Sequence, residues 1–449
     1  MTSICPWEAA VKLEAIDEID EEQKLFHMSL KDEKENMDPL LDVKSIVKEA
    51  KMRMKKPKQI PFVGTHRSVE KPAPNLYGCA FNQFIESRRL QCAAAVGGAY
   101  IFIYYFPKNR INKSYTLKLE QPYKEDLYQV TWCLDNHDFK IVAGGETGKL
   151  YVIDYDEMDI DRELIGTGGS INEIRTSPVN PTMIAVASAD TAIRVFDIRS
   201  PTCLLILGGR RGHRDSVLSL DWSPDGMRLM TGSFDHRVMM WDLSGEIVQR
   251  HFKICQYDLK SDGKIRKFNF YFGDRRLQAA RRVFDLEDHS MYIVTPMRLV
   301  DNLHFDSVDC VRFYGDYCFS RSAGHDSHIR FWRFGAHEQE KIGSGVVKMV
   351  QKQVPFGHPW FSKFAVDPCN QFLATGGHGG IMHIYDMTDN TLEPMRTCVV
   401  GKKEGMTRQV AFSNDGHFIF AVGDCGSIAR MNRVDPHADG AKIKDTWKK

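Results

Sequence analysis

The sequence repeats one short strand pattern seven times, and this repeat restricts the possible folds more than any other feature of the chain. Each copy is an apolar run that ends on an aromatic or large apolar residue, often followed by Asp. The runs begin at Ile101, Leu150, Ile193, Val238, Ile329, Met382 and Ile428. Five of the six steps between them are 43 to 53 residues long, close to the roughly 40–45 residues of one WD-type propeller blade. The spacing predicts an all-β, seven-bladed WD-repeat β-propeller.

The most complete copy runs from Gly212 to Asp242. Its glycine at 226 suits a tight turn between inner strands. We expect Asp235 to lie at a later turn, where its carboxylate can bond the ring of His213. Trp241 should pack between neighbouring blades. These three side chains are therefore predicted to be structural rather than catalytic.

One step of the repeat is 91 residues long, which allows two explanations. Either a degenerate blade is hidden there, or one loop is enlarged. Because seven copies already make a ring, we favour an insertion at about residues 248–300. Its interleaved basic and aromatic residues could suggest nucleic acid, but a surface for a protein partner is the simpler interpretation.

The ends of the chain differ from the repeat region. Residues 1–59 are acidic and then basic, and are predicted to form a largely disordered tail. The propeller should occupy residues 60–435, followed by a C-terminal tail at 436–449. The last copy supplies only three strands, so residues 60–70 are expected to add the fourth and close the ring.

Composition excludes several classes of protein. Lys and Arg total 60 against 59 for Asp and Glu, so any contact with nucleic acid should be indirect at most. No run reaches the roughly 18 apolar residues of a membrane helix. The eleven cysteines form no CxxC pair, which indicates reduced intracellular thiols. No P-loop, HExxH, GxSxG or zinc-ligand spacing is present. We expect no catalytic residues, no metal and no cofactor.

One position of the repeat predicts a binding site. It lies 20 to 24 residues before each third-strand start, near the rim of the central channel, and is occupied by Tyr77, Tyr128, Asn172, Leu218, Asp309, Trp360 and Arg408. In a closed ring, blades six, seven, one and two are consecutive, so Trp360, Tyr77 and Tyr128 should cluster, with Phe361 beside them. Such rings can form a cage for a methylated ammonium, or they can simply pack against loops. Arg408 could orient a peptide backbone or carboxylate.

These residues carry a family resemblance. The stretches SINEIRTSPVNP, GHRDSVLSLDWSPDG, SVDCVRF, PWFSKFAVD and TRQVAFSNDGHFIFAV resemble the extra sex combs/EED family, the WD-repeat subunit of Polycomb repressive complex 2. The resemblance extends from about residue 60 to residue 435.

The resemblance implies a nuclear, non-catalytic scaffold and reader subunit of a histone H3 methyltransferase complex. The residues of this chain that match the family's trimethyl-lysine cage are Tyr77, Tyr128, Trp360 and Phe361. The opposite face and side would hold a helix of the SET-domain methyltransferase subunit, which the bound mark stimulates, and other Polycomb subunits would complete the complex.

Two residues beside the cage match peptide-orienting positions of the family. Arg408 matches a family arginine, whereas Lys363 replaces one and lacks the planar guanidinium. A generic WD-repeat adaptor, such as a ubiquitin-ligase substrate receptor without methyl-lysine recognition, is the alternative function.

Overall fold

The computed structural model describes most of the predicted propeller. The described residues are 62–120, 124–200, 202–260, 290–301, 303–324, 328–334, 347–349, 361–388 and 394–434. The predicted tails at 1–59 and 436–449 lie outside them, as does much of the predicted insertion.

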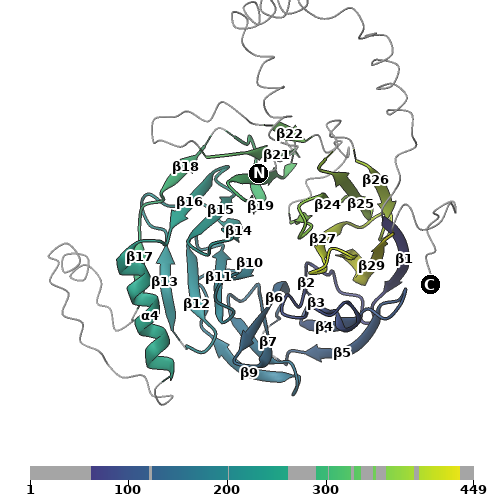
Figure 1. Ribbon diagram of the computed structural model, residues 1–449, viewed down its shortest axis with the longest axis horizontal. Helices are drawn as coiled ribbons and strands as arrows, with labels where there is room; N and C mark the ends of the chain where they lie inside the picture. Colours follow the sequence, from purple (N-terminus) through teal and green to yellow (C-terminus); the bar gives the residue numbers. More distant parts are fainter. Residues whose placement is uncertain are drawn as a thin grey trace, which may run out of the picture.

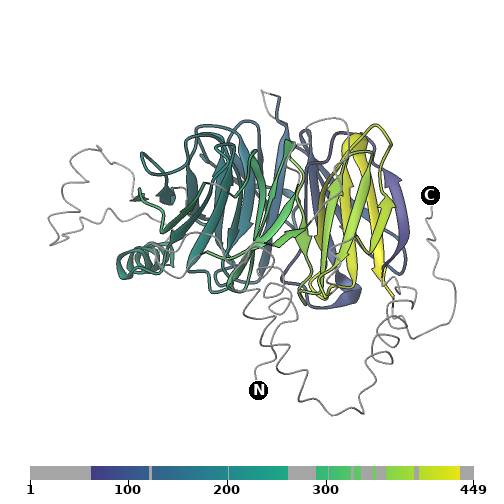
Figure 2. The same cartoon turned by 90° about the horizontal axis from the view of Figure 1, so that it is seen from above.

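Seven sheets, all antiparallel except for one added strand in blade 3, are arranged as blades round one axis (Figure 1; Figure 2 gives the side view). Blade 1 contains β2 (Gly78–Phe81), β3 (Cys92–Gly97), β4 (Tyr100–Tyr105) and β5 (Asn112–Lys118). Blade 2 contains β6 (Leu127–Asp135), β7 (Asp138–Gly145), β8 (Leu150–Asp154) and β9 (Asp159–Leu164). Blade 3 contains β10 (Ile171–Thr176), β11 (Met183–Ser188), β12 (Ile193–Asp197) and β13 (Cys203–Leu207).

The remaining blades repeat this order. Blade 4 contains β14 (Val217–Trp222), β15 (Arg228–Ser233), β16 (Val238–Asp242) and β18 (Arg298–Val300). Blade 5 contains β19 (Val308–Tyr314), β20 (Tyr317–Ser322), β21 (Ile329–Trp332) and β22 (Val347–Met349). Blade 6 contains β23 (Ala365–Val366), β24 (Phe372–Gly377), β25 (Ile381–Asp386) and β26 (Arg396–Val399). Blade 7 contains β27 (Thr407–Phe412), β28 (Phe418–Gly423), β29 (Ser427–Arg433) and β1 (Phe62–Val69). The seven predicted runs are the third strands, so the predicted fold class is confirmed.

Apolar packing between blades holds the ring together. The buried side chains form seven clusters, and each draws on two neighbouring blades. Trp241, for example, is fully buried with Val195 of blade 3 and Leu220 of blade 4. Because the second strands of the blades are covered on both faces, β11 (MIAVAS) and β28 (FIFAVG) are buried at all six positions and are nearly continuous apolar runs rather than alternating ones. The core is therefore a closed series of seven interfaces.

The predicted ring closure is present. β1 pairs antiparallel with β29, from Phe62 opposite Arg433 to Val69 opposite Ser427, and Figure 1 shows the two strands side by side at the outer edge of blade 7. The first described strand thus completes the sheet formed by the last three. This leaves β29 without an unpaired edge.

The long step of the repeat is an insertion between β16 and β18, not a hidden blade. It begins with the helix α4 (Glu246–Lys260), which the sequence analysis did not predict. Val248 and Phe252, four residues apart, are both buried in the cluster between blades 3 and 4. Further along, β17 (Met291–Ile293) pairs parallel with β13 and adds a fifth strand to blade 3. The region is thus partly built into the blades rather than being a loop throughout; residues 261–289 lie outside the described residues.

Candidate aromatic binding site at the channel rim

The predicted rim position coincides with a β-bulge in five of the seven innermost strands. The register shifts at the residues Tyr128, Asn172, Leu218, Asp309 and Arg408. A bulge inserts one unpaired residue, bends the strand and redirects that side chain. The position predicted from the repeat spacing therefore coincides with a β-bulge that recurs round the channel. In blade 1, Tyr77 directly precedes β2, and its amide donates to the Val96 carbonyl at 3.0 Å.

Three of the four predicted cage residues lie together. The ring centroids of Tyr77 and Tyr128 are 5.2 Å apart, with the planes at 78°. Phe361 lies 5.6 Å from Tyr77 at 86° and 5.4 Å from Tyr128 at 61°. The three rings thus meet as the walls of a corner, an edge-to-face arrangement that is favourable in itself. Trp360 lies outside the described residues.

A carboxylate that the sequence analysis missed lies beside this corner. The Tyr128 hydroxyl donates a hydrogen bond to the exposed side chain of Glu146. Burial, together with the hydrogen bond and charge of Glu146, holds the pKa of Tyr128 well above its usual value. Tyr128 therefore remains a neutral phenol, and Glu146 adds negative charge at the rim. The turn after a second strand carries no sequence signal that marks Glu146 in advance.

Arg408 is paired within the protein. Its Nε and one Nη donate to the two carboxylate oxygens of Asp424, at 2.7 and 3.2 Å. Its Cζ lies 5.4 Å from the centroid of the Tyr77 ring. The guanidinium thus lies against one cage ring and is fixed by a two-point contact. Its predicted role in orienting a peptide stays a prediction.

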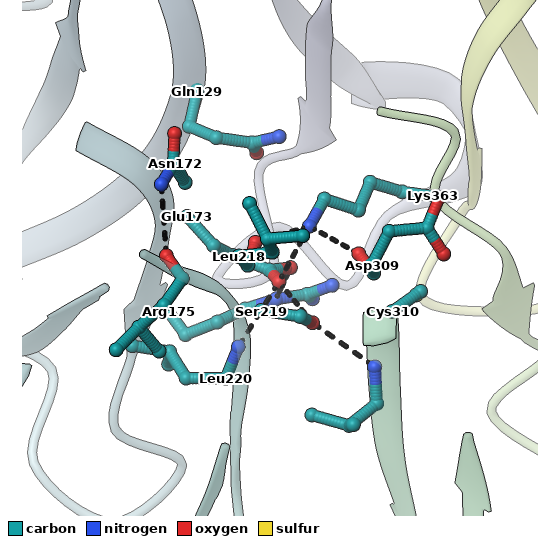
Figure 3. A network of polar contacts seen from close by, with 12 residues as sticks. Gln129, Asn172, Glu173, Arg175, Leu218, Ser219, Leu220, Asp309, Cys310 and Lys363 are labelled. Atoms are coloured by element: carbon teal, nitrogen blue, oxygen red, sulfur yellow. Dashed lines mark hydrogen bonds and ion pairs between the residues drawn. The ribbon is translucent and has the colours of Figure 1, made fainter. Parts of the chain in front are cut away.

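Lys363 does not lie where it was predicted. Only 1% of its surface is exposed. Its ammonium points into the network of polar contacts shown in Figure 3. Nζ lies 2.6 Å from the carbonyl oxygens of Leu218 and Asp309 and 3.2 Å from Glu173 Oε2. These acceptors come from blades 3, 4 and 5. The prediction that Lys363 contacts a peptide is therefore wrong, because its charge is buried and already paired.

Glu173 is the centre of this network. Arg312 Nη2 and Arg175 Nε lie 2.8 and 3.0 Å from its Oε1. Burial alone would raise the pKa of Glu173, but Arg312, Lys363 and Arg175 outweigh it and hold the pKa well below its usual range. The carboxylate is thus ionised, as buried charges are when fully paired. Charged residues inside the inner-strand runs INEIR and VRF were the available sequence signal.

The predicted structural residues form a chain of hydrogen bonds. His213 Nδ1 lies 3.0 Å from Asp235 Oδ2, and its Nε2 lies 2.8 Å from Thr231 Oγ1. The indole of Trp241 donates to the same hydroxyl at 3.0 Å. Blade 5 repeats the arrangement with His304, Ser320 and Trp332, a copy the sequence analysis missed.

Metal and membrane features are absent from the part of the chain that the structure describes. There, no three His, Cys, Asp or Glu side chains gather closely enough to hold a metal ion. Within the same residues, no helix is both long and apolar enough to cross a membrane.

Proteins of similar sequence identify the family of this chain. The family described as WD domain, G-beta repeat matches residues 202–242. Polycomb protein mes-6 of Caenorhabditis elegans is 34% identical over 435 residues, which cover 85% of this chain and 94% of mes-6. The chain belongs to this Polycomb family. Polycomb protein esc of Drosophila melanogaster is 26% identical, with 81% of this chain and 82% of esc covered. The extra sex combs resemblance predicted from the sequence is thereby confirmed.

Solved structures agree on the fold of this Polycomb family member. A chain of the Chaetomium thermophilum Polycomb repressive complex 2 superposes with a TM-score of 0.64 at 16% identity, covering 86% of this chain and all of that one. A chain of ctPRC2 in complex with H3K27me3 gives the same TM-score and identity, with 85% and 99% covered. At this identity the likeness establishes the propeller alone.

Proposed function

We propose that this chain is the non-catalytic scaffold and reader subunit of a Polycomb-type histone H3 methyltransferase complex, and that its aromatic corner binds a trimethylated lysine. The single observation that carries the proposal is the meeting of Tyr77, Tyr128 and Phe361 from three different blades, with mutual centroid distances of 5.2 to 5.6 Å. Membership of the Polycomb family supports it.

The chemistry of recognition follows from the rings. The face of an aromatic ring is negative, and each well-placed ring attracts a cation by about 0.5–2 kcal/mol. A trimethylammonium group suits such a corner because its methyl groups cover the charge and make dehydration cheap. It also donates no hydrogen bond, so it leaves none unmade among apolar walls. Trp360 would supply a fourth ring, and the Glu146 carboxylate would add attraction at the open side.

The remaining parts of the proposal concern partners and place. As a scaffold, the propeller would bind a helix of the SET-domain methyltransferase subunit on its other face and side, and would join other Polycomb subunits in the nucleus. Binding of the mark would raise the activity of that methyltransferase. The similarity to Polycomb proteins mes-6 and esc and the fold shared with chains of Polycomb repressive complex 2 support this part.

Calorimetry with trimethylated and unmodified histone H3 peptides tests the reader function. We expect Tyr128→Ala and Trp360→Ala to weaken binding of the trimethylated peptide by about tenfold or more. Tyr128→Phe keeps the ring and should stay within about threefold of the unchanged protein. The matched control is Tyr105→Ala, because Tyr105 is a 43% exposed tyrosine at the end of β4, the third strand of blade 1.

Two results would contradict the proposal. Equal affinity of the unchanged protein for both peptides would instead favour an adaptor without methyl-lysine recognition. Unchanged affinity in both alanine variants would show that these aromatic side chains do not bind the trimethylated lysine. Mass spectrometry of proteins that co-purify with the chain from nuclei tests the scaffold function separately, since the absence of a SET-domain methyltransferase would contradict it.

A further inference from the structure

One cage residue has an unfavourable backbone conformation. Phe361 has a φ of +70°, in the left-handed region that bulky residues rarely adopt. Such a conformation persists only where the surrounding structure holds it in place. The ring of Phe361 is 4% exposed and contacts both tyrosines. The corner therefore depends on whatever fixes this backbone.

The two residues that follow Phe361 are fixed from several blades at once. The amide of Lys363 donates to the Arg408 carbonyl of blade 7 at 2.8 Å. The Ser362 carbonyl accepts from Arg321 Nη1 of blade 5 at 2.7 Å. The Lys363 ammonium adds its contacts with Leu218 and Asp309 and the pair with Glu173. The segment beside the cage is thus held on both its backbone and its longest side chain.

A contribution to the free energy of folding does not explain why the ammonium of Lys363 is buried. A buried ion pair is often no better for stability than apolar residues of the same volume. Electrostatic attraction of a cationic ligand does not explain the buried lysine either, because Nζ of Lys363 lies 5.4 Å from the centroid of the Phe361 ring. A cation there competes with a bound ammonium for the same ring. What the lysine does supply is position: it links the segment that precedes blade 6 to the innermost strands of blades 3, 4 and 5.

We propose that Lys363 is a positioning residue of the cage, which acts through Glu173 to hold Phe361 in its left-handed conformation so that its ring completes the corner with Tyr77 and Tyr128. The inference rests on the proposed function, because it concerns the same methyl-lysine site. Lys363 itself touches no ligand. Its effect reaches the site only through the backbone of residues 361–363.

The decisive variants are Lys363→Met and Lys363→Arg, measured by calorimetry with the trimethylated H3 peptide. Glu173 keeps Arg312 and Arg175 in Lys363→Met, so its charge remains paired. We expect Lys363→Met to weaken binding of the trimethylated peptide by about tenfold, which matches the cost of a left-handed backbone at Phe361 that is no longer held in place. Lys363→Arg keeps a positive charge at this position and should retain most of the affinity. If Lys363 acted only through its charge, its removal would tighten binding. Unchanged or tighter binding in Lys363→Met therefore overturns the inference.

Hydrogen–deuterium exchange on the unchanged protein provides a test that needs no variant. We expect the Lys363 amide, which donates to the Arg408 carbonyl, to be strongly protected before any peptide is added. Exchange there as fast as in an exposed loop would overturn it. Failure of the proposed function is distinguishable, because the unchanged protein would then show no preference for the trimethylated peptide whatever the exchange result.

Discussion

Removal of one buried ring should weaken the closure of the propeller. Phe62 begins β1 and is fully buried. Its ring packs edge-on against Phe372 of blade 6 at 5.2 Å and against Phe412 of blade 7 at 6.1 Å. Its carbonyl accepts a hydrogen bond from Arg396 at 2.7 Å. Phe62→Ala therefore removes the ring that fastens β1 to two blades.

The expected size of the effect follows from burial. Truncating a fully buried phenylalanine to alanine costs about 3–5 kcal/mol, because transfer energy is lost and a cavity remains. The control is Val69→Ala on the same strand, whose side chain is 47% exposed. A surface substitution of that kind should change the free energy of unfolding by about 0.5 kcal/mol or less.

Urea unfolding followed by tryptophan fluorescence measures the difference. With a slope of about 3 kcal/mol per molar urea, Phe62→Ala should lower the midpoint by roughly 1–1.7 M. Val69→Ala should leave it nearly unchanged. Equal midpoints for the two variants would refute the reasoning, because β1 would then contribute no packing to the closure of the ring.

Three further predictions follow from other sites. Trp241→Ala should destabilise the fold by about 3–5 kcal/mol through loss of a buried indole, and an unchanged urea midpoint would contradict its place between blades. Burial raises the pKa of Asp235, but its hydrogen bond and charge contact with His213 outweigh burial and lower the pKa overall. The stability this gives is present above the unfolded pKa of about 3.9 and is lost as the pH falls through the lower folded value, so the midpoint gap between the unchanged protein and Asp235→Asn should close below about pH 4. Glu146→Gln should weaken binding of the trimethylated peptide by about two- to fivefold at low salt and less at high salt, and a salt-independent loss would contradict an electrostatic role.

Strand positions could be predicted because they depend on local pattern. The third strand of each blade is an apolar run that the propeller needs at a regular spacing, so Leu150 and Ile193 begin strands where the repeat placed them. The rim position could be counted because a bulge occurs at the same place in successive innermost strands, as at Tyr128 and Arg408.

Other features depend on partners distant in the sequence. The direction of the Lys363 side chain is set by acceptors as far away as Glu173, 190 residues earlier in the chain. The helix α4, by contrast, could have been predicted, because Val248, Phe252 and Cys255 follow one another at the four- and three-residue spacing of one helix face and pack against the blades. Glu146 could not be singled out from the sequence, because only the fold brings its carboxylate to the Tyr128 hydroxyl.

The pairing of β1 with β29 has a consequence for synthesis of the protein. β1 leaves the ribosome hundreds of residues before β29, yet Phe62 has its partner at Arg433. Contacts so distant in sequence form slowly, and an unpaired apolar strand is prone to aggregate while it waits. Blade 7 packs between blade 6 and blade 1, so Phe361 and Tyr77 are brought together only once blade 7 is in place. The binding corner can therefore form only after the strands of blade 7 have been synthesised.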